Sequence, residues 1–211
     1  MISTGFVAWI GVIGTILGTL VGGVLTYVAT ARQDSRRRAQ ELADLKASIY
    51  SEIADRAARC VNDYLDPWRD NVRLNKLSPE WVGKFRPTDP VVLPGVAGKL
   101  GLLDGETLLA VTQFYFRLDV LTKALESLCA SLERRGSVKG LAHEADKARV
   151  EAIARRLESC FNPALRALQN LNVGPAAANF DDAATRVYPH LRKSGLTLRQ
   201  ALKEHFPTEK A

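Results

Sequence analysis

The sequence predicts an all-α protein with one N-terminal transmembrane helix, followed by an antiparallel bundle of three long helices. Three observations lead to this prediction. Residues 2–31 contain no charged side chain, apolar residues recur every three or four positions through most of the remaining chain, and only the short run 91–93 has a β-type composition. The chain has 211 residues, so a body of about 180 follows the span, which is enough for one domain with a hydrophobic core.

The expected boundaries follow from changes in composition along the chain. They are a transmembrane helix at 2–31, a basic juxtamembrane segment at 32–38, a helical bundle at 39–206 with a proline-rich elbow at 67–104, and a C-terminal tail at 207–211.

The uncharged run is long enough to cross a membrane. Thirty residues of helix reach about 45 Å, whereas a bilayer core is about 30 Å thick. The alternative is a cleaved signal peptide, because Ala29-Thr30-Ala31 resembles a cleavage site. A signal peptide would have a basic residue before its apolar core and a core about half this long, whereas here the basic residues follow the run. These differences favour a retained span.

The arginines after the run set the expected orientation. No Lys or Arg precedes the run, and its C-terminal side carries Arg32, Arg36, Arg37 and Arg38. The positive-inside rule therefore predicts a single-pass protein with the N-terminus outside and the body in the cytoplasm. We expect the membrane to be a bacterial inner membrane. The same arginines are expected to meet anionic membrane lipid, at roughly 1 kcal/mol each near the surface. Their simplest role is to fix the topology, and the alternative is recognition of a particular lipid.

The run also has a broad face of small residues. Glycines and threonines recur at four-residue spacing in two neighbouring rows, and four residues make about one helical turn. Such a face lets a second helix approach closely, so we expect the span to self-associate and the protein to be a homo-oligomer. The glycines expected at this contact are Gly11, Gly14, Gly18, Gly22 and Gly23. The alternative is that they reflect only the general frequency of glycine in membrane helices.

The net charge of +6 does not indicate nucleic-acid binding. The juxtamembrane arginines supply much of this charge, and the other basic pairs are scattered instead of forming one stripe with interleaved aromatic side chains. We therefore expect no nucleic-acid partner.

No residue pattern indicates catalysis, a metal or a cofactor, and we expect none of the three. A metal-binding helix needs a second His or Cys at the i+3 or i+4 spacing, which is missing around His143, His190 and His205. The three cysteines are widely spaced and form no CxxC pair, and each falls in an apolar helical phase. We therefore expect buried free thiols at Cys60, Cys129 and Cys160. An enzyme whose site forms only in three dimensions is left as an alternative.

The first helix of the body is expected to continue from the span and to end before Pro67, because no glycine or proline interrupts it earlier. Its apolar stripe comprises Leu42, Leu45, Ile49, Ile53, Ala57, Cys60, Val61, Tyr64 and Trp68. This stripe can pack on a helix of the same chain or on a second copy, and the sequence leaves both alternatives open.

Proline and glycine break the helical pattern in the elbow. Ser78 as a cap and Pro79 at the first position predict a short helix there. The run 91–93 is β-like, but it is too short and isolated to build a sheet. Because so long a connection is unusual in a compact domain, we expect any ligand or partner site here, and the alternative is an ordered loop that caps the core.

Two long helices and two short ones are expected after the elbow. Asp104 should cap the first, which ends at Gly136, and a short turn then predicts an antiparallel helix at about 141–171. Asn162-Pro163 either kinks that helix or starts a new segment, and Gly174-Pro175 ends it.

In the tail of the bundle, Asp181 or Asp182 is expected to cap a helix that runs towards Tyr188. Thr197 is expected to cap another over 198–206.

Residues 99–115 carry a resemblance to a known group of sequences. Lys99-Leu100-Gly101-Leu102-Leu103 is followed by Val111 and then by Phe114-Tyr115. This stretch is similar to one in uncharacterised bacterial single-pass membrane proteins, which have an N-terminal span, a helical body and an LGLL segment before a helix with a Phe-Tyr pair. The resemblance implies the same layout, but no activity and no binding residues. In physical terms, LGLL predicts a tight turn that feeds two leucines into the core.

The function expected from the sequence is that of a membrane-anchored helical scaffold or adaptor that self-associates through its span. One alternative is a small oligomeric pore or membrane-perturbing protein, although the span offers only Thr and Gly as a polar lining. Another is a membrane-tethered enzyme. Whether a second protein is a partner is left open.

Overall fold

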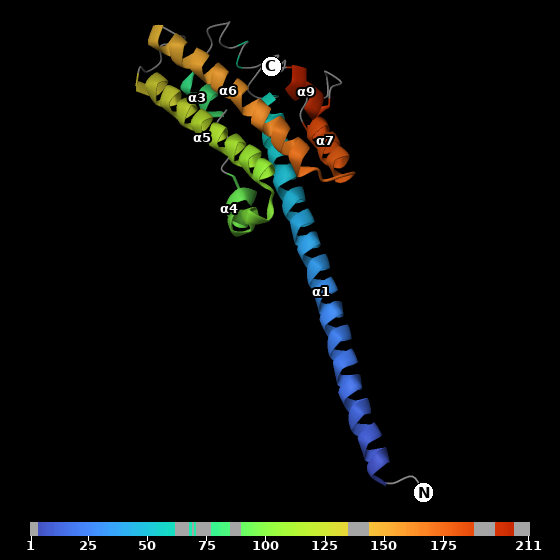
Figure 1. The fold of residues 1–211 in the computed structure, drawn as a ribbon. Helices are drawn as coiled ribbons and strands as arrows, with labels where there is room; N and C mark the ends of the chain where they lie inside the picture. Colours follow the sequence, from blue (N-terminus) through green and yellow to red (C-terminus); the bar gives the residue numbers. More distant parts are fainter. Residues whose placement is uncertain are drawn as a thin grey trace. The chain divides into compact units, whose positions relative to one another are not determined.

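The computed structural model describes residues 4–61, 68, 70, 77–84, 90–134, 144–187 and 197–204, with the backbone alone at 4–21, 144–146, 184–187 and 204. The regular elements in these ranges are all helical, as the sequence predicts (Figure 1). They are α1 (Thr4–Arg59), α3 (Pro79–Lys84), α4 (Val92–Val96), the 3-10 helix η2 (Ala97–Leu102), α5 (Gly105–Arg134), α6 (Glu144–Leu171), α7 (Ala176–Val187) and α9 (Leu198–Glu204). The chain divides into two compact units, Met1–Asp44 and Leu45–Ala211.

The first unit contains the N-terminal part of α1. Residues 2 and 3 of the expected span, and the side chains of 4–21, lie outside the described residues. From residue 22 to residue 40 every side chain is exposed, including Leu25 at 65% and Tyr27 at 76%. Within the part of the chain that the structure describes, we find no helix whose length and apolarity would let it cross a bilayer.

The second unit, which we call the body, has the later residues of α1 in its core. The described residues of the predicted stripe are buried from Leu45 onward within the same chain, which favours packing in the same chain for this part of the stripe, and Tyr64 lies outside the described residues. Burying one such aliphatic side chain is worth roughly 1.5–3 kcal/mol. The buried hydrophobic residues of this segment are Leu45, Ile49, Tyr50, Ile53, Ala54, Ala57, Ala58, Cys60 and Val61.

Helices α5 and α6 pack side by side in antiparallel directions, as predicted (Figure 1). Asp104 caps α5, because its Oδ1 accepts the Thr107 N–H at 2.8 Å and its Oδ2 accepts the Thr107 hydroxyl at 2.7 Å. These hydrogen bonds lower the pKa of Asp104, and the charge of Lys46 acts in the same direction. The buried residues of α5 include Val111, Phe114, Tyr115, Leu118, Leu121, Leu125, Leu128 and Leu132.

Helix α6 runs without interruption through Pro163 to Leu171, so the alternative in which Asn162 starts a new segment is wrong. The helix ends with two residues of positive φ, Asn172 at 39° and Gly174 at 61°. Glycine adopts this backbone conformation without the steric cost of a Cβ atom, which explains its place in the turn before α7.

In the elbow, the first short helix is capped as predicted, whereas residues 91–103 differ from the prediction. Ser78 caps α3, since its Oγ accepts the Trp81 N–H at 3.2 Å. The β-like composition of 91–93 is misleading, because Val92 and Leu93 form the first turn of α4. The LGLL segment forms part of η2, and only Leu103 enters the core, because Leu102 is 46% exposed.

Of the two caps predicted for the C-terminal helices, one is confirmed and the other is wrong. Thr197 caps α9 reciprocally: its Oγ1 accepts the Gln200 N–H at 3.3 Å, while its own N–H donates to Gln200 Oε1 at 2.9 Å. Helix α7 begins at Ala176, so Asp181 and Asp182 lie inside it and do not cap it. Tyr188 and the tail at 207–211 lie outside the described residues.

Candidate functional site

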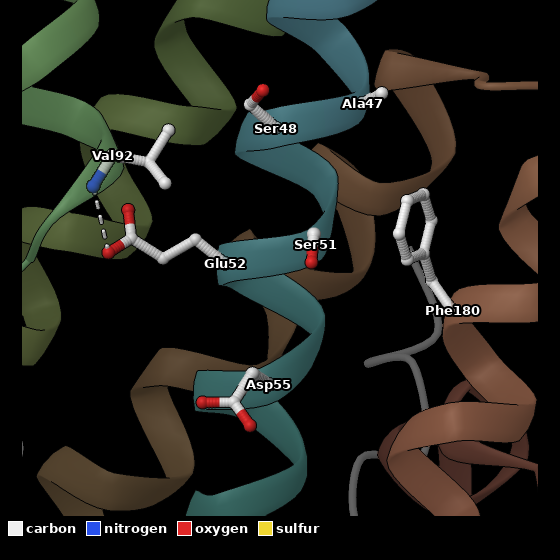
Figure 2. A pocket seen from close by; sticks show the side chains of 7 residues that line it. All are labelled: Ala47, Ser48, Ser51, Glu52, Asp55, Val92 and Phe180. Atoms are coloured by element: carbon white, nitrogen blue, oxygen red, sulfur yellow. Dashed lines mark hydrogen bonds between the residues drawn. The ribbon is translucent and has the colours of Figure 1, made fainter.

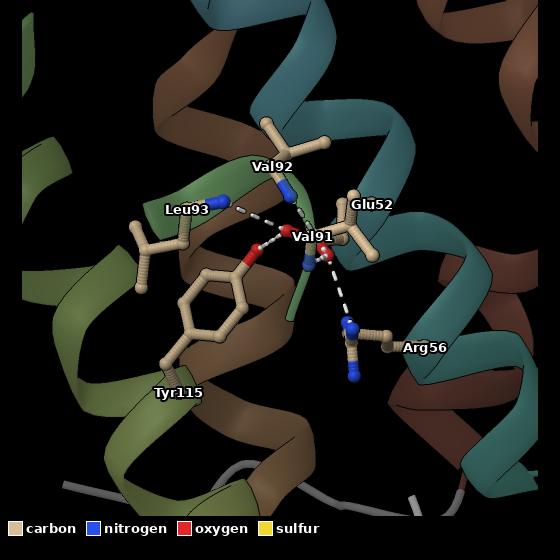
Figure 3. A network of polar contacts seen from close by, with 6 residues as sticks. All are labelled: Glu52, Arg56, Val91, Val92, Leu93 and Tyr115. Carbon is tan, nitrogen blue, oxygen red and sulfur yellow. Dashed lines mark hydrogen bonds and ion pairs between the residues drawn. The ribbon is translucent and has the colours of Figure 1, made fainter. Parts of the chain in front are cut away.

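The carboxylate of Glu52 joins α1 to the elbow and to α5 (Figure 3). It accepts hydrogen bonds from three backbone N–H groups, one hydroxyl and one guanidinium. The donors to Oε1 are Val91 N at 2.7 Å, Val92 N at 3.3 Å and Arg56 Nη2 at 3.0 Å, and those to Oε2 are Leu93 N at 3.2 Å and Tyr115 Oη at 2.5 Å. We call these six residues the Glu52 cluster.

The backbone of α4 explains why a carboxylate is needed at this place. The first N–H groups of any helix have no partner within the helix, and an anion there is favoured by the helix dipole. Val91 precedes α4 and its side chain cannot cap. Glu52, which is 39 residues away in sequence, supplies the missing acceptor. A residue of α1 therefore fixes the backbone of the elbow at 91–93.

The two charged side chains of the Glu52 cluster are buried. The side chains of Glu52 and Arg56 are 8% and 7% exposed. Burial alone would raise the pKa of Glu52, but the hydrogen bonds from Tyr115, from the backbone of Val91 and Val92 and from Arg56 lower it below its usual value. Burial raises the pKa of Tyr115, and its bond to Glu52 raises it further. At neutral pH the pair is therefore a carboxylate and a protonated phenol.

A groove of about 430 Å³ lies along α1 next to this cluster (Figure 2). Ser48, Ser51 and Asp55 on α1 form its floor, together with Ala47. Glu52 and Val92 line the elbow side, and Phe180 of α7 lines the opposite side. The groove thus lies between the elbow and α7.

A second polar cluster holds the C-terminal helices to α1. The hydroxyl of Tyr50 donates to Asp181 Oδ1 at 2.9 Å and accepts from Arg199 Nη2 at 2.8 Å, while Arg199 Nε lies 3.3 Å from Asp181 Oδ2. Burial raises the pKa of Tyr50, and Asp181 raises it further whereas Arg199 opposes the rise. The ring of Phe180 lies 5.6 Å from that of Tyr50, so this cluster supports the Phe180 side of the groove.

The polar groups of the two clusters are arranged to connect helices, and their geometry does not suit catalysis. A carboxylate offers about four lone-pair sites, and Glu52 already accepts five hydrogen bonds, so it has no remaining capacity to take a proton from a substrate or to bind a cation. Among the described residues, no group of three or more His, Cys, Asp or Glu side chains is placed to hold a metal ion. The three histidines lie outside the described residues.

The site residues predicted from the sequence are not brought together in this region. Gly22 and Gly23 are exposed, and a Cβ atom added to either would meet nothing within 4 Å, while the side-chain positions of Gly11, Gly14 and Gly18 lie outside the described residues. The arginines Arg32, Arg36, Arg37 and Arg38 are all exposed. Arg37 pairs with Glu41 at 3.1 Å. Two of the expected buried thiols, Cys60 and Cys160, are buried, whereas Cys129 is partly exposed.

Sequence reasoning missed Glu52, Arg56 and Asp181 as structural centres. One signal was present: Glu52 and Arg56 have the i,i+4 spacing of a helical ion pair, and Glu52 directly precedes Ile53 of the buried stripe. The long-range donors carry no comparable signal, because backbone N–H groups are present in almost every residue.

Comparisons with protein-family models, with curated proteins and with solved structures found no match for the chain.

Proposed function

We propose that the chain is a membrane-anchored helical scaffold or adaptor, attached to the cytoplasmic face of a bacterial inner membrane by residues 2–31 and self-associating through them. The observation that carries the proposal is α1 itself. One helix, Thr4–Arg59, contains most of an uncharged run that is long enough for a bilayer and also supplies buried residues to the core of the body.

The body supports a binding role better than a catalytic one. Its most buried charged groups, Glu52 and Arg56, are used in connecting helices. Asp181 and Arg199 have the same role at the C-terminal helices. Such connections give a rigid helical surface, which is what a scaffold presents to a partner.

Membrane attachment is tested by fractionation of cells that express the tagged full-length protein. We expect the protein to stay in the membrane pellet after alkaline carbonate washing, and protease added to intact spheroplasts should leave the body intact. A protein released by carbonate would overturn the anchor, and digestion of the body from outside would overturn the orientation.

The scaffold role is tested by purifying the full-length protein in mild detergent and determining the mass and composition of the complex. A homo-oligomer or a stoichiometric second protein supports the proposal. A monomer without a partner overturns it. The pore alternative predicts ion conductance after reconstitution of the homo-oligomer in a planar bilayer.

A further inference from the structure

The two walls of the groove along α1 are held in different ways. The elbow wall, at Val92, is bound by Glu52, whose side chain is 8% exposed. The opposite wall is formed by Phe180 of α7 (Figure 2). It is held next to α1 by a polar cluster in which the side chains of Asp181 and Arg199 are 15% and 35% exposed. Ion pairs that reach water contribute little to stability, so the wall at α7 is the more weakly held of the two.

Helix α7 contributes little to the core. Among its described side chains, at 176–183, none is buried. The helices before and after it in the chain differ, because α6 ends with the buried Leu171 and α9 buries Leu198, Ala201 and Leu202. Helices in proteins are stabilised mainly by packing of an apolar face. We therefore expect α7 to detach at a lower free energy than its neighbours in the chain.

The turn before α7 is suited to act as a hinge. Residues 172–175 form this turn, and none of them is buried. Asn172 and Gly174 have positive φ values, and a Cβ atom added at Gly174 would meet nothing within 4 Å. Hinges in proteins are a few residues at the ends of elements that absorb a change in φ and ψ. Packing at this turn therefore offers little resistance to a rotation of α7.

Two adjacent residues of α7 dock it onto the body. The ring of Phe180 lies 5.6 Å from that of Tyr50, and Asp181 accepts the Tyr50 hydroxyl at 2.9 Å and lies 3.3 Å from Arg199 Nε. Arg199 also donates directly to the Tyr50 hydroxyl at 2.8 Å, so α9 keeps a contact with α1 when Asp181 moves away. Because the two docking residues are neighbours, one movement of α7 releases both.

We propose that α7 is a movable wall of the groove, which pivots about residues 172–175 between a closed position against Tyr50 and an open position, while the elbow wall stays fixed. Opening widens the groove and uncovers one side of Tyr50, which is fully buried in the closed position. An occupant larger than the closed groove of about 430 Å³ selects the open position. This device lies within the body and goes beyond the proposed function, because it does not depend on the membrane anchor.

Hydrogen exchange of the full-length protein in detergent gives the first test. Amides at 180–187 should exchange together and faster than those in the middle of α6, because exchange follows the opening equilibrium. Phe180→Ala should raise the rate in α7 about fivefold, the factor that corresponds to roughly 1 kcal/mol for an aromatic pair, and should leave α6 unchanged. Asn179→Ala, at an exposed position of α7, is the matched control, because Phe and Asn have similar helix propensities. The difference between the two variants therefore measures the ring contact.

Distances across the groove give a second test by double electron–electron resonance. In a Cys129→Ser background the two remaining cysteines are buried. Spin labels on Val91→Cys and Asn179→Cys join the elbow to α7, and labels on Val91→Cys and Lys123→Cys join the elbow to α5 as the control. All three labelled side chains are exposed, Val91 at 79% and Lys123 at 71%.

The two label pairs should behave differently. The 91–179 pair should show a broad distance distribution with a component at longer distance, which grows in Asp181→Asn. The 91–123 pair should show one narrow distribution that Asp181→Asn does not change, since the cluster around Glu52 joins the elbow to α5.

The contrary results are distinct in the two experiments. Amides of α7 that exchange as slowly as those of α6 overturn the movable wall, and so do equal effects of Phe180→Ala and Asn179→Ala. An equal rise of exchange in α6 and α7 would show that the body unfolds as one unit, which also overturns it. A 91–179 distribution as narrow as that of the control pair, in the wild type and in Asp181→Asn, has the same meaning.

Discussion

The hydroxyl of Tyr115 donates to the carboxylate of Glu52 at 2.5 Å, across 63 residues of sequence. The same carboxylate accepts the N–H groups at the start of α4, so one side chain of α1 binds both α5 and residues 91–93 of the elbow. Because this acceptor is buried and charged, the stability of the body should depend strongly on it.

Glu52→Ala should lower the free energy of unfolding by about 3 kcal/mol, because removing one member of a buried ion pair leaves its partners without their acceptor. Hydrogen exchange of the full-length protein in detergent should show faster exchange at the amides of 91–93. Glu41→Ala, which removes a pair whose side chains are 78% and 39% exposed, is the control and should cost less than about 0.5 kcal/mol. Equal effects of the two substitutions would contradict the role of Glu52.

Low pH should destabilise the folded body through protonation of Glu52. The pKa of Glu52 is lowered in the folded protein, so its stabilising contribution is present above the unfolded value of 4.5 and is lost as the pH falls through the lower folded value. Unfolding measured between about pH 3 and pH 7 should therefore show a shallower pH dependence in Glu52→Gln than in the wild type. If the stabilities of the two proteins had the same pH dependence, carboxyl groups other than Glu52 would be responsible for it.

Asp181→Asn should loosen the C-terminal helices. The substitution weakens the hydrogen bond from Tyr50 and the ion pair with Arg199, at a cost of about 1 kcal/mol because the pair is partly exposed. Amides of α7 and α9 should exchange faster, while those of α5 stay protected. Asn179→Ala, at an exposed position of the same helix, is the control and should leave exchange in α9 unchanged.

Gly18→Leu should weaken self-association of the span, because a leucine prevents the close approach that a glycine face allows. A membrane two-hybrid assay measures the effect. Leu20→Phe enlarges a residue on the opposite side of the predicted helix and should leave association unchanged. Association that survives Gly18→Leu at the wild-type level would rule out this glycine face as the contact.

The thiols should differ in reactivity. Burial raises the pKa of Cys160 to about 12, with the charge of Arg117 opposing the rise, and the side chain is fully buried. Alkylation of the folded protein at mildly alkaline pH should therefore modify Cys129 before Cys160, and denaturant should expose all three cysteines. Mass spectrometry of the modified peptides gives the order. Modification of Cys160 as fast as Cys129 would contradict its burial.

Local features of the fold could be predicted from the sequence because their causes lie within a few residues. Ser78, Asp104 and Thr197 each cap a helix through a partner three residues ahead, and all three were predicted. The stripes of α1 and α5 follow from helical periodicity in the same way. These patterns were sufficient for the all-α class and for the order of the long helices.

The features that the sequence did not predict depend on contacts with residues that are distant in the chain. The composition of 91–93 is β-like and did not indicate the helix start that Glu52 stabilises there. Asp181 has the residue type of a cap, yet its partners are Tyr50 and Arg199, which are 131 and 18 positions away. Neither contact leaves a periodic signal in the sequence, so the centres of the candidate site were found only in three dimensions.

The position of α1 in the core has a consequence for biosynthesis. A ribosome completes residues 45–61, which include the end of α1, before it makes α5 and α6, which extend to Leu171. At about 5–20 residues per second, the 110 residues from 61 to 171 take roughly 5–20 s. For that time Glu52 lacks its hydrogen bond from Tyr115 of α5, and Ile49, Ile53 and Ala57, which are buried in the finished body, belong to a body that is still incomplete. The nascent chain therefore offers an apolar helix to chaperones before its body can close around it.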